Sequence, residues 1–176
     1  MEVKIWTLVS NTAAGEGPGH SAVQVGETIY TFEDTGGWFD SGSGWKVVES
    51  RKYLAANEHR PVLIQSIPKA NSASVQKYVT RSIENDDDYG GSGVCSQQVA
   101  RAVNFALPAE IDFDPKGFDT PYGVYHCARR LELVDGEQYF WPGKGKINAL
   151  AWARIVNKLR VDFPAAFRSM DLSPNY

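Results

Sequence analysis

The chain has 176 residues, of which 43% are hydrophobic and 22% charged, and its formal net charge is -3. This length and balance predict one globular domain, residues 1–176, with a core that needs no disulfide framework. They exclude the clustered basic face of a nucleic-acid-binding protein, since Lys and Arg are scattered and the isoelectric point is about 5.6. No apolar run approaches the roughly 18 residues of a membrane span.

The ends and the cysteines add further expectations. The segment from Met1 to Trp6 lacks the charged start and apolar stretch of a secretory signal. We therefore expect the protein to act in the cytoplasm, or to be secreted without a cleaved signal peptide. Cys95 and Cys127 allow at most one disulfide, and no His/Cys cluster indicates a zinc site. We expect neither a metal nor a cofactor.

In chain order, alternating and β-branched runs predict strands in the first part of the sequence. They cover residues 3–9, 21–25, 28–33, 45–48 and 62–67, and Gly26-Glu27 joins the second to the third as a tight hairpin turn. Apolar stripes predict helices over residues 72–84, 95–106 and 147–162. A further strand is expected within residues 122–134. The sum is an α+β domain.

Cys95 is the candidate nucleophile. It follows the glycine-rich segment 90–93 and opens a predicted helix. Unpaired N–H groups and the helix dipole at such a position favour a thiolate and can hold a developing oxyanion. Gly93 lets a substrate carbonyl approach the backbone closely. The alternative is a buried structural cysteine, which is how we interpret Cys127, inside the expected strand.

His20 stands at the start of the predicted hairpin and is the candidate base. A two-residue turn pairs Val25 with Thr28, and counting outward from that pair places His20 opposite Glu33. A carboxylate there can accept a hydrogen bond from the imidazole, fix its tautomer and stabilise the protonated ring. A different turn would move Glu33 to the other face, and Asp34 is then the alternative orienting residue.

The other histidines are weaker candidates. His126 precedes Cys127 in the expected strand, so the two side chains should point to opposite faces. His126 stays the second candidate for the base, since the fold could bring it to Cys95 from another element. His59 lies in a polar segment and is expected to be solvated.

An aromatic, glycine-rich segment could line a substrate groove. Trp38, in residues 37–40, and Trp45 are the candidate walls, and the alternative is that they anchor the loop hydrophobically. The acidic run Asp86-Asp87-Asp88 could meet a cationic group, but we interpret it as a solvated loop.

Two segments resemble parts of the NlpC-type peptidoglycan hydrolases, a bacterial branch of the papain-like fold. Residues 18–26, Pro-Gly-His-Ser-Ala-Val-Gln-Val-Gly, and 29–33, Ile-Tyr-Thr-Phe-Glu, resemble the histidine hairpin of that family. Residues 89–99, Tyr-Gly-Gly-Ser-Gly-Val-Cys-Ser-Gln-Gln-Val, resemble the start of its nucleophile helix. His20 here comes 75 residues before Cys95 (95 minus 20). This order is similar to the circularly permuted branch, which includes the lecithin–retinol acyltransferase type.

The resemblance implies a circularly permuted papain-like fold, with an antiparallel sheet packed on the helix that carries Cys95. It implies a cysteine peptidase or amidase that cleaves amide bonds in peptidoglycan stem peptides or cross-links through an acyl-enzyme. Cys95, His20 and Glu33 would be catalytic, although the family often has a histidine where this chain has Phe32 and Glu33. The expected substrate-binding residues are Gly93, Trp38 and Tyr89.

A small member without a signal peptide also resembles antibacterial effectors delivered to a target-cell periplasm by contractile, type VI secretion machinery. Such toxins are typically neutralised by a cognate immunity protein. Two other functions stay open. One is a thiol deamidase, protease or acyltransferase that acts in a cytosol on a protein or lipid. The other is a non-catalytic binding domain, which predicts an inaccessible Cys95 or one with no histidine within reach.

Overall fold

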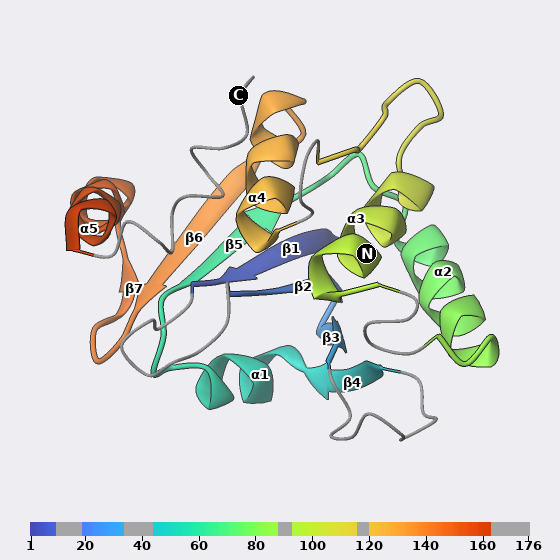
Figure 1. Cartoon of the computed structure of the whole chain (residues 1–176), viewed down its shortest axis with the longest axis horizontal. Coiled ribbons are helices and arrows are strands. Elements are labelled where there is room, and N and C mark those ends of the chain that lie inside the picture. The colour runs from blue at the N-terminus through green and yellow to red at the C-terminus, as the bar shows by residue number, and fades with distance from the viewer. Residues whose placement is uncertain (10–18, 34–43, 88–92, 116–119, 163–176) are drawn as a thin grey trace.

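The computed structural model describes residues 1–9, 19–33, 44–87, 93–115 and 120–162, and these residues form an α+β fold (Figure 1). One antiparallel sheet has seven strands in the order β4-β3-β2-β1-β5-β6-β7. The strands are β1 (Val3–Leu8), β2 (His20–Val25), β3 (Thr28–Phe32), β4 (Trp45–Glu49), β5 (Val62–Ser66), β6 (Gly136–Trp141) and β7 (Gly145–Ile147). The helices are α1 (Ser50–Ala56), α2 (Ser72–Glu84), α3 (Cys95–Ala106), α4 (Pro121–Arg130) and α5 (Ala149–Asp162).

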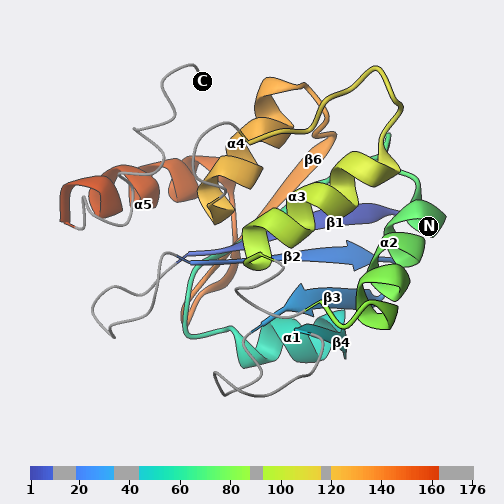
Figure 2. The ribbon, with the colours of Figure 1, turned by 45° about the vertical axis from the view of Figure 1, so that its right-hand side comes forward.

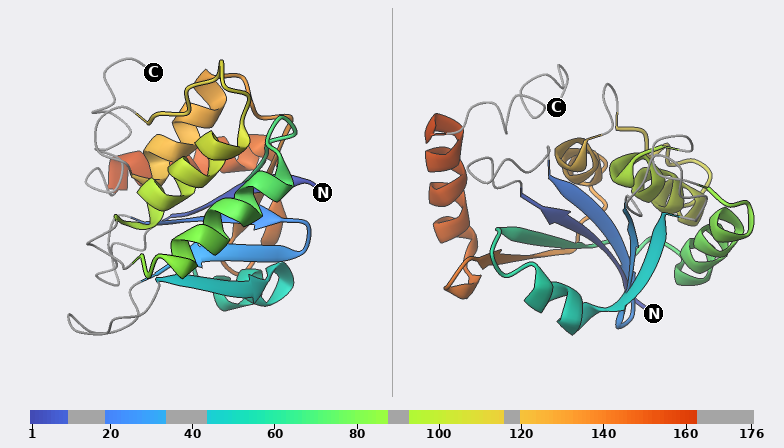
Figure 3. Two further views of the ribbon diagram at one scale, coloured as in Figure 1. Left: turned by 90° about the vertical axis from the view of Figure 1, so that its right-hand side faces the viewer. Right: turned by 60° about the horizontal axis from the view of Figure 1, so that its bottom comes forward.

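The two faces of the sheet carry different helices. Figures 2 and 3 show α2, α3 and α4 on one face and α1 on the other. Side chains alternate between the faces along each strand. Ile5 and Val23 therefore enter the main core, where they join Val99 of α3. Trp6 and Ala22 enter a smaller core on the face of α1. None of the described helices is long and apolar enough to cross a membrane.

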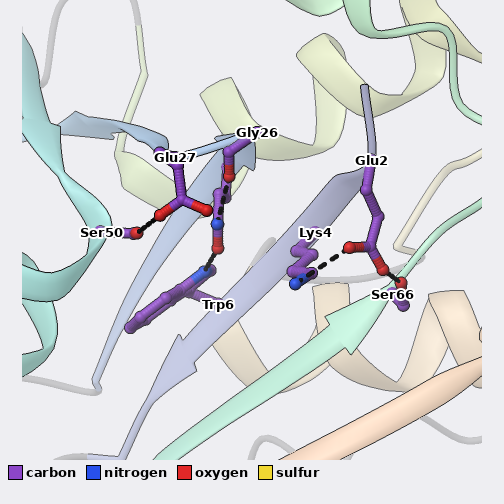
Figure 4. Close-up of polar contacts among 8 residues, drawn as sticks. Glu2, Lys4, Trp6, Gly26, Glu27, Ser50 and Ser66 are labelled. Carbon is purple, nitrogen blue, oxygen red and sulfur yellow. Dashed lines mark hydrogen bonds and ion pairs between the residues drawn. The ribbon is translucent and has the colours of Figure 1, made fainter.

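The hairpin between β2 and β3 has the predicted register. Val25 pairs with Thr28, and Gly26 begins the two-residue turn with a φ of 59°, a conformation that glycine adopts without strain. The turn is tied to the start of α1, because the Ser50 backbone N–H donates to the Glu27 carbonyl oxygen at 2.9 Å. The Ser50 hydroxyl also donates to the Glu27 carboxylate at 3.2 Å (Figure 4). These contacts hold α1 against the hairpin.

The prediction of a strand within residues 122–134 is wrong, because this segment contains helix α4. Its start is specified locally: the Thr120 side chain accepts a hydrogen bond from the Gly123 N–H at 3.0 Å, and Pro121 occupies the first turn. Val124 and Cys127 are fully buried at helical spacing. The run of β-branched and aromatic residues resembles a strand, but the capping signal before it determines the structure. Helix α1 and strands β6 and β7 were not predicted.

Candidate functional site

Cys95 is the first residue of α3, as predicted, and its neighbours explain why the helix begins there. Gly93 has a φ of 124°, and a Cβ added to it would lie 2.9 Å from Oε1 of Gln97, so only glycine fits without a shift. That Gln97 oxygen accepts a hydrogen bond from the Val94 N–H at 3.0 Å. Cys95 is not part of a disulfide and is 4% exposed. It shares the buried face of α3 with Val99, Ala102, Val103 and Ala106.

His20 opens β2 and lies beside β1, where it pairs with Leu8. Its Nε2 atom is 2.6 Å from Oγ1 of Thr31, and the Thr31 hydroxyl donates to Oε1 of Glu33 at 3.0 Å. The hydroxyl of Tyr53, on α1, lies 3.2 Å from the same Thr31 oxygen. The buried hydroxyl of Thr31 therefore stands between the imidazole and the Glu33 carboxylate, where a direct contact was expected.

The side chain of His20 and the helix that carries Cys95 lie on different faces of the sheet. His20 shares its strand face with Ala22, which packs in the smaller core, whereas α3 packs on the opposite face through Val23. The two elements that His20 and Cys95 open, β2 and α3, begin at the same end of the sheet (Figures 2 and 3). Burial raises the pKa of Tyr53 well above its usual value, against the hydrogen bond with Thr31, and the charges of Glu33 and Cys95 raise it further.

The electrostatics of the network assign a charge state to each member. Burial lowers the pKa of His20 to about 4, against the attraction of Glu33, while the charges of Arg60 and Lys46 lower it further. Burial raises the pKa of Glu33, but hydrogen bonds from Lys46 and Thr31 outweigh this and hold that pKa below its usual value. Lys46 Nζ lies 2.9 Å from Oε2 of Glu33. At neutral pH the imidazole is neutral and the carboxylate is ionised.

Cys127, His126 and His59 have surroundings that differ from those of Cys95 and His20. Cys127 is fully buried in the main core, and this burial raises the pKa of its thiol to about 11, which fits a structural role. His126 lies on α4, not in a strand, and its ring packs against that of Tyr125 with the centroids 4.8 Å apart. His59 is exposed, as predicted.

The expected substrate-binding residues are only partly described. Gly93 lies two residues before the start of α3, but Trp38, Tyr89 and the alternative orienting residue Asp34 lie outside the described residues. Trp45 does not wall a groove: it is 6% exposed and its indole N–H donates to the Ser82 hydroxyl at 2.8 Å. In the described part of the chain, no group of three or more His, Cys, Asp or Glu side chains could hold a metal ion.

The roles of Thr31 and Tyr53 in the polar network were not predicted from the sequence. A signal for Thr31 was present, because it lies two residues before Glu33 and therefore on the same face of the strand. Tyr53 had no such signal, since it comes from α1, which the hydrophobic pattern did not predict.

Comparisons with protein-family models, with curated proteins and with solved structures give no match. The function of this chain is therefore inferred from its own residues.

Proposed function

We propose that this protein is a cysteine hydrolase of amide bonds, with Cys95 as nucleophile and His20 as base. One observation carries the proposal: the imidazole of His20 is linked through Thr31 to Glu33, and the strand that His20 opens begins at the same end of the sheet as α3, whose first residue is Cys95. A nucleophile, a base and a group that orients the base are the parts that this chemistry requires. The arrangement would be that of a circularly permuted papain-like fold.

The reaction follows from these roles. His20 takes the thiol proton of Cys95 as the sulfur attacks the amide carbonyl carbon, and a C–S bond forms. The N–H groups at the start of α3 stabilise the negative charge that develops on the carbonyl oxygen. The C–N bond then breaks, and the amine leaves with the proton from His20. Water, deprotonated by His20, attacks the thioester, so that the acid is released and the Cys95 thiol is restored.

For the substrate we propose a peptide bond in peptidoglycan stems or cross-links, on the resemblance of the His20 and Cys95 segments to NlpC-type hydrolases. The protein would then act as an antibacterial effector in a target-cell periplasm, with a cognate immunity protein as its partner. The alternative within the same chemistry is a cytosol-acting deamidase, protease or acyltransferase.

Expression of the protein directed to a bacterial periplasm tests the substrate. Wild type is compared with Cys95→Ala and His20→Ala, and Cys127→Ala serves as the matched cysteine control. We expect lysis and new muropeptides from wild type and Cys127→Ala, and from neither of the other two. Equal lysis by all four, or none by wild type, contradicts the periplasmic function. Toxicity confined to cytosolic expression supports the alternative substrate.

A non-catalytic binding domain is the second candidate, and the low exposure of Cys95, at 4%, favours it. A catalytic thiol must react with a small electrophile in the native protein, whereas a structural thiol must not. Native protein is therefore treated with iodoacetamide and the labelled cysteine is identified by mass spectrometry. Labelling of Cys95 supports the hydrolase, and labelling of neither cysteine supports the binding domain.

A further inference from the structure

The Thr31 hydroxyl is the centre of the polar network, and it has three partners. Its oxygen lies 2.6 Å from Nε2 of His20, 3.0 Å from Oε1 of Glu33 and 3.2 Å from the hydroxyl oxygen of Tyr53. Thr31 is fully buried. A hydroxyl offers one hydrogen and two lone pairs. The hydrogen and each of the two lone pairs of Thr31 therefore interact with one partner.

The direction of each hydrogen bond follows from the charge of Glu33. The carboxylate is ionised, since Lys46 pairs with its other oxygen at 2.9 Å, and an ionised carboxylate only accepts. The single hydrogen of Thr31 thus points to Glu33. The same oxygen must then accept hydrogens from His20 and from Tyr53. His20 consequently carries its hydrogen on Nε2, and the lone pair of Nδ1 is left available.

We propose that Thr31 is the positioning residue of the site: it holds His20 in the Nε2–H tautomer, so that Nδ1 is the atom that takes the proton of Cys95. Tyr53 fills the second lone pair of the hydroxyl and so keeps its hydrogen directed to Glu33. When Nδ1 is protonated, Glu33 stabilises the ring through Thr31 and not by direct contact. This inference rests on the proposed function, because it assigns an atom to the base.

The tautomer is measured on the wild-type protein without any substitution. Long-range nitrogen–proton NMR spectra of protein labelled with ¹⁵N-histidine distinguish the two neutral tautomers of each ring. We expect His20 to show hydrogen on Nε2 at pH 7. Hydrogen on Nδ1 would overturn the inference and leave the Cys95–His20 pair untouched.

The positioning role is tested by the rate at which iodoacetamide labels Cys95, followed from pH 5 to 9. Arg60, Lys46 and Glu33 are the charges that act on His20, and all three are kept in these variants. Thr31→Val should slow labelling at pH 7 by about 10- to 100-fold, the factor that a hydrogen bond to a charged group supplies. It should also move the midpoint of the pH profile upward, because the protonated ring loses its link to Glu33.

Two further variants separate position from packing. Thr31→Ser keeps the hydroxyl and should restore both the rate and the pH midpoint. Thr7→Val is the matched control: Thr7 is a buried threonine on β1, the strand that pairs with β2, and its hydroxyl has no hydrogen-bond partner among the described residues. It should label like wild type.

The failures of the two proposals are distinguishable. If His20→Ala slows the labelling of Cys95 and Thr31→Val does not, the positioning role of Thr31 is wrong and the hydrolase proposal stands. If His20→Ala and wild type react at the same rate, the proposed base is wrong and the role of Thr31 fails with it.

Discussion

His20 should make the protein less stable as the pH falls, and the size of the effect follows from its surroundings. Burial lowers the pKa of His20 from 6.5 to about 4, so between these two values the unfolded chain binds a proton that the folded chain does not. The stabilising contribution is complete above pH 6.5 and is lost as the pH falls towards 4. At about 1.4 kcal/mol for each pH unit, the loss is about 3 kcal/mol in the free energy of unfolding.

The assay compares wild type with His20→Gln by urea unfolding between pH 7 and 4, followed by tryptophan fluorescence. Glutamine can still donate a hydrogen bond to Thr31, but it does not titrate. Wild type should lose about 3 kcal/mol more than the variant over this range. His59→Gln, at an exposed histidine, should leave the wild-type pH dependence unchanged. Parallel curves for wild type and His20→Gln would refute the assignment of a half-buried, neutral imidazole to His20.

Three further predictions concern Gly93, the cap of α4 and the Cys127 thiol. Gly93→Ala should lower the free energy of unfolding by about 1–3 kcal/mol, because residue 93 has a positive φ. Gly136→Ala is the control and should change this free energy little, because an added Cβ there would lie in open space. Equal effects of the two substitutions in thermal unfolding would contradict the prediction. Thr120→Ala should lower the free energy of unfolding in urea by about 1 kcal/mol, because α4 loses its N-terminal cap. Thr120→Ser keeps the hydroxyl, so a serine variant as unstable as the alanine variant would argue against capping. In Cys95→Ala, iodoacetamide should label Cys127 only after unfolding, and rapid labelling of the native variant would show that this thiol is accessible.

The hairpin and the nucleophile helix were predictable because their signals are local. Gly26-Glu27 determines the turn type and with it the pairing of Val25 with Thr28, and the glycine-rich approach to Cys95 determines where α3 begins. The bounds of α2 and α3 agree with the prediction for the same reason. The segment 122–134 was misread because β-branched and aromatic residues fit a strand as well as a buried helix, and only the capping by Thr120 distinguishes them.

The sequence by itself determined which reactive residues open a strand and a helix, since turn geometry and helix starts depend on a few neighbouring residues. Only the tertiary structure decided what lies around them. Tyr53 comes to Thr31 because α1 is tied to the hairpin turn through Ser50, and no periodicity along the chain encodes that contact. The hydroxyl between His20 and Glu33 depends on how three elements meet at one end of the sheet. Side-chain partners from distant segments are selected by packing, and packing is set by the whole fold.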